Sequence, residues 1–134
     1  MDSQYLNYFK NINTKKQINK LIKKYKNKKI ILYGAGIMSK ILFENYDFSK
    51  LNIVAFCDSK YKINSSEKFI SYPVINPIEL KEKDFDLILV NLRKSVGAIE
   101  NIKHEILINS KNEGKKVDNL LKPTLSFLIK QILF

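Results

Sequence analysis

The chain has very little cysteine: Cys57 is the only one among 134 residues. A single thiol cannot build a disulfide framework or a cysteine metal site within the chain, and this favours a reducing compartment. Residues 1–4 contain no basic stretch leading into an apolar run, so no signal peptide is expected. No apolar stretch is long enough to span a bilayer. We therefore expect a cytoplasmic protein.

Arginine is almost absent as well. Arg93 is the only one, and the other 23 basic residues are lysines, although the net charge is +11. Arginine would be expected at bidentate contacts to phosphates or bases. The charge is also uneven, because residues 1–30 hold nine lysines and one acidic residue, a net +8, and the remainder is only mildly basic. We interpret most of this charge as a solvated face and do not expect nucleic acid as a partner.

The most informative segment runs from Lys29 to Ser39. An apolar, β-branched run leads directly into Gly34-Ala35-Gly36, and an apolar-periodic stretch follows. This order predicts a strand, a tight glycine turn and the start of a helix, where nucleotide phosphates often bind. Gly34 would allow the turn, and Gly36 would let the backbone approach a pyrophosphate. Ser39 stands in place of the third glycine of the usual fingerprint and is small enough for close helix–strand packing.

A second apolar run, residues 52–57, predicts another buried strand that ends at Asp58, 22 residues after Gly36. An acidic residue at about this spacing can accept hydrogen bonds from ribose hydroxyls. The alternative keeps the fold without a ligand. In that case Gly34 and Gly36 only make the turn and Asp58 only caps the next loop, since a fold does not fix a function.

Strand and helix patterns alternate along the rest of the chain. We expect strands at 51–57, 72–75, 86–90 and 115–120, and helices at 37–46, 76–80 and 96–112. Asn76 would cap the short helix with Pro77 in its first turn, Ser95 would cap the long one, and Gly114 would end it. The fold class is therefore α/β: a Rossmann-like three-layer sandwich with a parallel sheet of about five strands, plus N-terminal and C-terminal helices.

The two ends of the chain differ from its centre. We divide the chain into a basic helical arm at 1–28, a Rossmann-like nucleotide-binding domain at 29–120 and an apolar C-terminal helix at 121–134. Residues 14–27 form an amphipathic pattern with Asn13 or Thr14 as N-cap, and residues 1–12 suggest a short helix or an arm that packs on a neighbour. A basic amphipathic helix can lie on a membrane surface, but we favour packing against the chain's own sheet.

The C-terminal segment, residues 120–134, is very apolar but too short to cross a bilayer. It needs a partner surface, which is the domain's own sheet, a second subunit or a bilayer surface. The sheet would already have helices on both faces. We therefore expect a homodimer built partly from residues 120–134, with peripheral membrane contact as an alternative.

Catalytic constellations are not evident. Tyr46 and Lys50 have the spacing of a short-chain dehydrogenase pair, but they fall at the end of the first crossover helix, so we interpret the match as coincidence. His104 is the only histidine and lies off the apolar stripe of its helix. Asp84 and Asp86 flank the start of a strand and are interpreted as loop residues. No catalytic residue and no metal site is predicted.

These motifs together resemble a known family. The chain resembles the small Rossmann-like nucleotide- or nucleotide-sugar-binding domain of bacterial surface-polysaccharide biosynthesis proteins. Examples are the N-terminal domain of sialic-acid and bacillosamine acetyltransferases and nucleotide-sugar dehydratase-like proteins. The resemblance covers roughly residues 15–110, and its most specific parts are the turn Tyr33-Gly34-Ala35-Gly36, the strand end Phe56-Cys57-Asp58 and the segment Tyr72–Leu80. Ser71 departs from the glycine often found before that segment.

The resemblance implies a nucleotide or nucleotide-sugar at the carboxyl ends of the strands. Carried over by motif, three groups of residues would line the site: the phosphate turn, the ribose or base contacts, and the opposite lip. These are, in that order, Gly34, Ala35, Gly36, Ile37 and Met38; Asp58 and Ser59; and Asn91 and Arg93.

Three functions remain open. The first is a small accessory or partial enzyme domain that binds a nucleotide-sugar in surface-glycan (capsule or lipooligosaccharide) biosynthesis. The second is an NAD(H)-binding oxidoreductase-like or redox-sensing domain, because Asp58 can recognise any ribose diol. NADP fits less well, since a carboxylate repels a 2′-phosphate, although Lys60 and Lys62 soften that exclusion. The third is a ligand-free structural domain that dimerises.

Overall fold

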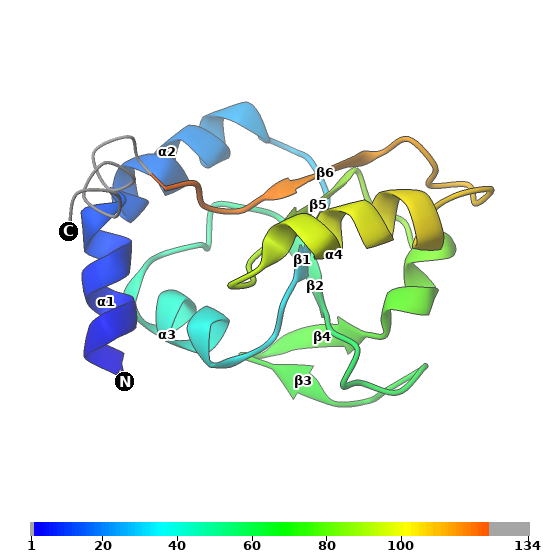
Figure 1. Ribbon diagram of the computed structural model, residues 1–134, viewed down its shortest axis with the longest axis horizontal. Helices are drawn as coiled ribbons and strands as arrows, with labels where there is room; N and C mark the ends of the chain where they lie inside the picture. Colours follow the sequence, from blue (N-terminus) through cyan, green and yellow to red (C-terminus); the bar gives the residue numbers. More distant parts are fainter. Residues whose placement is uncertain (1, 124–134) are drawn as a thin grey trace.

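The computed structural model describes residues 2–123 and is a mixed α/β structure built on a six-stranded sheet (Figure 1). The strand order is β3-β4-β2-β1-β5-β6, and every neighbouring pair is parallel except β3 with β4. The strands are β1 (Ile30–Tyr33), β2 (Ile53–Cys57), β3 (Lys68–Phe69), β4 (Tyr72–Ile75), β5 (Leu87–Val90) and β6 (Lys116–Asn119). The α/β class expected from the sequence is confirmed.

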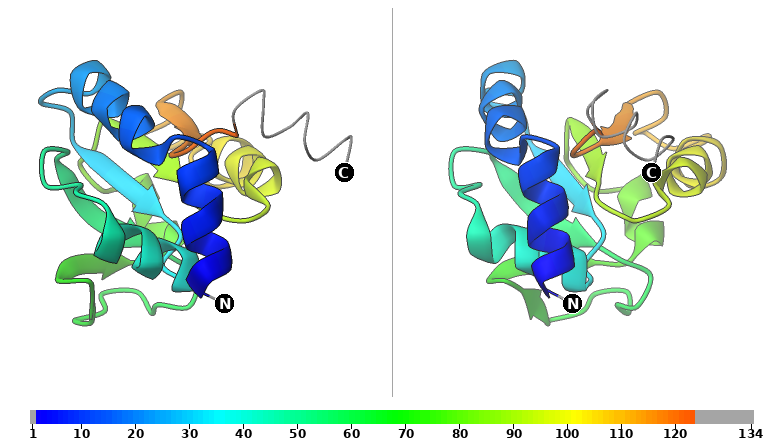
Figure 2. Two further views of the ribbon diagram at one scale, coloured as in Figure 1. Left: turned by 90° about the vertical axis from the view of Figure 1, so that its left-hand side faces the viewer. Right: turned by 60° about the vertical axis from the view of Figure 1, so that its left-hand side comes forward.

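Helical segments cover both faces of this sheet. They are α1 (Asp2–Asn11), α2 (Thr14–Lys24), α3 (Ile37–Asn45), the 3₁₀ turn η1 (Pro77–Lys81), α4 (Ser95–Asn101) and the π-helical turn η2 (Ile102–Ile106). Figure 2 shows α1 to α3 on one side of the sheet and α4 on the other. Successive side chains of a strand point to opposite faces, so Ile30 and Leu32 join the core beneath α1–α3 while Ile31 joins the core beneath η1, α4 and η2.

The two N-terminal helices are part of the same core. Phe9 of α1 is fully buried and packs edge-on against the ring of Tyr46 at 6.2 Å, while Ile18 and Tyr25 of the α2 region join the same cluster. The N-cap position of α2 is Asn13, one of the two residues expected there. It has φ 56°, and its side chain makes no capping bond.

The long helix expected over 96–112 is also wrong in extent. The α-helix ends at Asn101 and continues only as the π-helical turn to Ile106, where the N–H of Leu107 bonds the Ile102 carbonyl at 2.9 Å. The expected Ser95 cap is wrong, because Lys94 occupies the N-cap position and Ser95 is the first residue of the helix. Gly114 does not end this helix; it lies in the turn before β6 with φ +82°.

One strand pair was not expected at all. β3 pairs antiparallel with β4 through a turn in which Ile70 and Ser71 have φ 49° and 70°. Positive φ at both central residues is typical of the mirror-image hairpin turns, which normally use Asn and Gly. The sheet therefore has six strands where about five were expected, and Ser71 occupies a conformation that suits the glycine it replaces.

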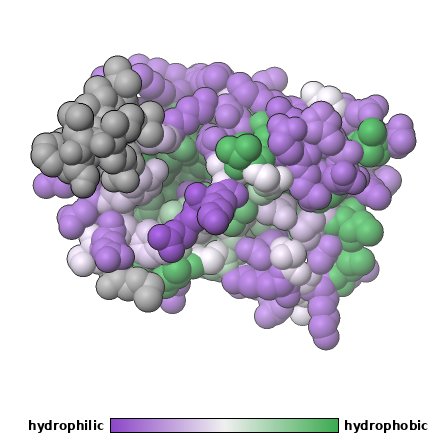
Figure 3. All heavy atoms as spheres, in the orientation of Figure 1, coloured by the Kyte–Doolittle hydropathy of each residue, from purple (hydrophilic) through white to green (hydrophobic). Residues whose placement is uncertain are grey.

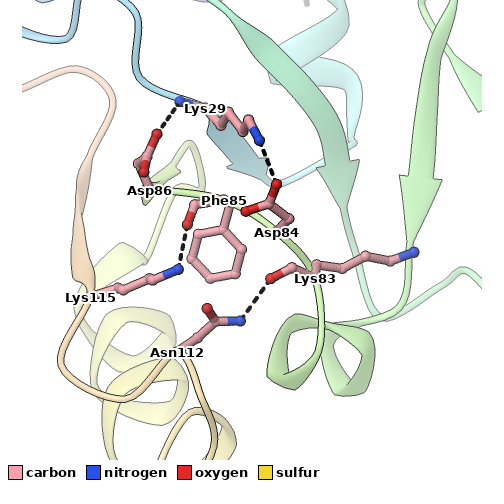
Figure 4. Close-up of polar contacts among 7 residues, drawn as sticks. All are labelled: Lys29, Lys83, Asp84, Phe85, Asp86, Asn112 and Lys115. Carbon is pink, nitrogen blue, oxygen red and sulfur yellow. Dashed lines mark hydrogen bonds and ion pairs between the residues drawn. The ribbon is translucent and has the colours of Figure 1, made fainter.

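At the amino ends of the strands, polar contacts hold the loop between η1 and β5 (Figure 4). The Lys29 N–H donates to Asp86 Oδ2 at 2.7 Å, and the Lys29 ammonium pairs with Asp84. Asn112, which is fully buried, donates to the carbonyl of Lys83 at 2.9 Å from the opposite side. The interpretation of Asp84 and Asp86 as loop residues is confirmed.

The expected apolar helix at 121–134 and most of the expected dimer surface fall on residues 124–134, which lie outside the described residues. Both stay predictions. Within residues 2–123, none of the helices is long and apolar enough to cross a membrane.

Candidate functional site

The glycine turn joins the carboxyl end of β1, a central strand, to α3. Gly34 has φ +119°, and a Cβ atom placed on it would lie 2.4 Å from the Asn91 carbonyl oxygen. A side chain is therefore excluded here by backbone conformation and by the neighbouring chain. The folded structure alone accounts for glycine at this position.

Gly36 is different. Its φ is −107°, which every residue adopts, and a Cβ placed on it would meet no atom within 4 Å. It is exposed and occupies the N-cap position of α3. The fold does not need glycine at this position. Because glycine has no side chain, the approach to the N-terminus of α3 stays open.

The third position of the motif is filled by a buried hydroxyl. Ser39 is 1% exposed and donates to the Gly34 carbonyl at 2.7 Å. It accepts a hydrogen bond of 3.0 Å from the Asn91 side-chain amide. The close packing expected of a small residue is present, and the hydroxyl in addition links the glycine turn to the end of β5.

Asp58 reaches the same turn from the end of β2. Its Oδ2 accepts a hydrogen bond from the Ala35 N–H at 2.9 Å, and its Oδ1 accepts one from the Lys60 N–H at 3.1 Å. The Lys60 ammonium donates to the Ala35 carbonyl. Asp58 and Lys60 therefore bond the N–H and the carbonyl of the same residue, Ala35. Asp58 stabilises the glycine turn in this way whether or not a ribose binds.

The remaining expected residues fall into two groups. Ile37 is 49% exposed at the start of α3, and Ser59 and Arg93 are also exposed. Met38 is half-buried against the core under α3, and Ala35 is fully buried. Within residues 2–123, Arg93 forms no ion pair. The exposed backbone at Gly36 and the Arg93 guanidinium are thus both available to a ligand.

Burial and charge set the protonation of two groups at this edge. Burial, with smaller effects of Asp58 and Glu79, raises the pKa of the Cys57 thiol far above its usual range. Burial, with smaller effects of Cys57 and Asp58, raises the pKa of the Tyr33 hydroxyl. Both side chains are neutral near pH 7, so neither is a nucleophile activated by its surroundings.

Sequence reasoning did not assign Lys60 to the turn. The only signal in the sequence was a lysine two residues after an aspartate that ends a strand. The direction of the lysine side chain depends on the loop conformation, which the sequence does not give. Its ammonium also lies 5.6 Å from the centre of the Phe69 ring, on the unexpected strand β3. The charge of Lys60 next to the N-terminus of α3 favours an anion there.

The other polar side chains considered as catalytic candidates contact residues close to them in the structure. His104 is exposed and lies 3.1 Å from Glu100 on the preceding helical turn. Tyr46 is partly buried, and its ring packs against that of Phe9. Within residues 2–123, no three His, Cys, Asp or Glu side chains are grouped so that they could hold a metal ion.

Residues 26–117 match the family described as C2185-like, N-terminal. The chain belongs to this family. In this C2185-like chain the matched span begins after α2 and ends within β6, so it includes the glycine turn, Asp58 and Asn91. No curated protein and no solved structure matches the chain.

Proposed function

We propose that this chain binds a nucleotide or nucleotide-sugar at the carboxyl ends of β1, β2 and β5. We further propose that it serves as a small accessory or partial enzyme domain in cytoplasmic steps of bacterial surface-glycan biosynthesis. The glycan context comes from the resemblance of its motifs to domains of polysaccharide-biosynthesis proteins. The binding site has independent support from the strand order and from the glycine turn.

The strand order supports a Rossmann-like three-layer arrangement. Leaving out the antiparallel β3, the parallel strands run β4-β2-β1-β5-β6, so the chain moves outward in one direction from β1 and then returns to the other side at β5. In open sheets of this kind ligands bind outside the carboxyl ends, where the strand order reverses. That position lies between β1 and β5, beside Gly36 and Asn91.

Gly36 is the observation that carries the proposal. Gly34 is explained by its backbone and its neighbour, but Gly36 is explained by neither. A glycine that leaves free N–H groups at the start of a nine-residue helix is what a phosphate group requires. Asp58 and the cation of Lys60 flank this point, so a ribose and its phosphates would find an acceptor and a positive charge next to each other.

The NAD(H) alternative rests on Asp58, because a carboxylate at the end of β2 suits the ribose of either ligand. Titration calorimetry of the full chain with UDP- and CMP-sugars and with NADH separates the two. Binding of a sugar nucleotide but not NADH supports the proposal, whereas binding of NADH alone shifts the function to a redox domain. No binding by any of them favours a ligand-free structural domain.

Gly36→Val is the decisive variant, because a branched side chain would occupy the space that a phosphate must enter. We expect ligand affinity to fall more than tenfold, equivalent to about 1.4 kcal/mol or more, with the fold retained. Gly97→Val is the matched control for adding a branched side chain, since Gly97 in α4 also has open space around its Cβ and is not one of the expected site residues. Unchanged affinity in a folded Gly36→Val variant would overturn the proposed site.

A further inference from the structure

The segment that carries Arg93 is held against the glycine turn. The Asn91 N–H donates to the Tyr33 carbonyl at 2.8 Å, at the end of β1. The Leu92 Cδ2 atom lies 3.1 Å from the place that a Cβ atom would take on Gly34. Arg93 is the next residue, so its Cα atom is about 3.8 Å from that of Leu92. Its side chain therefore starts at the crevice between β1 and β5, where the proposed ligand binds.

The Arg93 side chain is free to bind an anion. It is exposed, and within residues 2–123 its guanidinium makes no hydrogen bond and no ion pair. The acidic side chain of α4, Glu100, lies beside His104 instead. A guanidinium presents its N–H donors in a planar fork that fits a phosphate group in a bidentate manner.

Arginine at this position is unusual for this chain, because the other 23 basic residues are lysines. Lysine supplies the charge of the solvated faces. Helix α2, for example, has five lysines and no acidic residue, and hydrophilic side chains cover the upper margin of the molecule, over α2, in Figure 3. A position that needed only a positive charge could be filled by lysine like the others. Arg93 therefore indicates a contact that depends on the geometry of the guanidinium.

The expected ligand contacts follow the order of the strands. β1 lies between β2 and β5, and Asp58, Gly36 and Arg93 come after the carboxyl ends of β2, β1 and β5 respectively. Neighbouring strands are about 4.8 Å apart, so the segments after β2 and β5 begin about 10 Å from each other. The groups of a nucleoside diphosphate come in the same order, which is ribose, first phosphate and second phosphate. With the ribose at Asp58 and the first phosphate at Gly36, the second phosphate lies toward Arg93.

The charge of this edge also suits two phosphates. Residues 34–39, 58–62 and 91–96 contain one acidic side chain, Asp58, and four cationic ones. The cationic side chains are those of Lys60, Lys62, Arg93 and Lys94. A diphosphate brings more negative charge to this excess of cations than a monophosphate does, so the coulombic attraction favours the diphosphate.

We propose that Arg93 binds the second phosphate of a nucleoside diphosphate. It thereby makes the site selective for ligands with two linked phosphates, such as UDP-sugars, over ligands with one, such as CMP-sugars. This inference rests on the proposed nucleotide site and names the class of ligand that the site takes. Two N–H groups of the guanidinium would donate to two oxygens of the second phosphate. Arg93 therefore selects the number of phosphates and not the base.

The test is titration calorimetry of the full chain with pairs of nucleotides that share a base: UMP and UDP, CMP and CDP, AMP and ADP, and GMP and GDP. For a base that binds, we expect the diphosphate to bind more tightly by about tenfold or more, because a charge-assisted bidentate contact is added. Arg93→Gln should lower the affinity for the diphosphate to that for the monophosphate and leave the affinity for the monophosphate nearly unchanged. Arg93→Lys should restore only part of the difference. Lys94→Gln removes the neighbouring exposed cation, so it is the matched control and should keep most of the difference.

Gly36→Val separates this role from the site itself, because it obstructs the first phosphate and should weaken both members of a pair. The role of Arg93 is overturned, while the nucleotide site stands, if the unchanged chain binds both members equally or if Arg93→Gln weakens both equally. It is also overturned if Lys94→Gln lowers the affinity for the diphosphate as much as Arg93→Gln does, or if Arg93→Lys restores the whole difference. If none of the four pairs binds the unchanged chain, the proposed function fails and the role of Arg93 fails with it.

Discussion

The side chains of Ser39 and Asn91 meet in the interior, where the Asn91 Nδ2 donates to the Ser39 Oγ at 3.0 Å. The two residues are 52 positions apart, and the contact joins the first turn of α3 to the residue that follows β5. Ser39 donates in turn to the Gly34 carbonyl. Ser39, which stands in place of the motif's third glycine, therefore forms a buried hydrogen-bonded link between Gly34 and Asn91 at the proposed site.

Restoring that glycine should destabilise the protein. Ser39→Gly removes both hydrogen bonds and leaves the Asn91 amide without this partner, which costs about 1–3 kcal/mol, and glycine in a helix adds up to about 1 kcal/mol. The free energy of unfolding in urea measures the loss. Ser59→Ala, at an exposed position, should change it by less than about 0.5 kcal/mol. A Ser39→Gly variant as stable as the unchanged protein would refute a structural role for this link.

Substitution of the two glycines of the turn should change stability by very different amounts. Gly34→Ala forces a Cβ against the Asn91 carbonyl in a left-handed conformation and should cost about 3 kcal/mol. Gly36→Ala should alter stability by less than about 1 kcal/mol, because its backbone angles suit alanine and its surroundings are open. Thermal unfolding distinguishes them. Equal destabilisation would mean that Gly36 also has a structural role, which would remove the main support for a ligand there.

Continuous apolar runs made β1, β2 and β5 predictable, because strands buried on both faces need no polar alternation. Parallel pairing of β1 with β2 brings Asp58 close to the glycine turn, but the 2.9 Å hydrogen bond that its carboxylate accepts from the Ala35 N–H was not predicted from the sequence. The β3–β4 hairpin was not predictable, because its turn uses Ile70 and Ser71 at positive φ.

The early end of α4 could not be predicted from the sequence either. Apolar residues continue at helical spacing as far as Ile106, but η2 is a π-helical turn. Beyond it the buried side chain of Asn112 bonds the carbonyls of Leu80 and Lys83 across the sheet end. Long-range polar contacts of this kind, like that of Ser39 with Asn91, depend on side-chain positions that periodicity does not encode.

Asn112 should be needed for the loop between η1 and β5. Its Nδ2 donates to the Leu80 carbonyl at 2.6 Å and to the Lys83 carbonyl at 2.9 Å, and its Oδ1 is buried with no partner among the described residues. Asn112→Ala should cost about 1–3 kcal/mol by leaving carbonyls unpaired. Asn112→Asp should cost more, because a carboxylate would face those carbonyl oxygens. Urea unfolding tests this order, with exposed Asn101→Ala as the control, and a more stable Asn112→Asp variant would contradict it.

Cys57 should make stability fall at alkaline pH. Its pKa is raised above the ordinary 9.0 by burial, so the folded state keeps a proton that the unfolded state releases. The unfolded state therefore binds fewer protons above that value, and the unfolding free energy falls by up to about 1.4 kcal/mol per pH unit. Cys57→Ala should flatten this slope, although Tyr33 and Tyr61 still titrate in both proteins. Identical slopes would show that the thiol is not protected in the folded state.

Asp58 should distinguish ribose from deoxyribose. Asp58→Ala removes the acceptor for the Ala35 and Lys60 N–H groups, so its stability should also fall, by about 1–3 kcal/mol. Comparing two ligands within the same variant cancels that common effect. Ribonucleotides should lose about 1.5–3 kcal/mol of binding free energy per lost hydroxyl bond, while 2′,3′-dideoxy analogues should lose little. Calorimetry on the folded variant measures both. If the two ligand classes weaken equally, the carboxylate acts by holding the glycine turn, and the ribose contact is wrong.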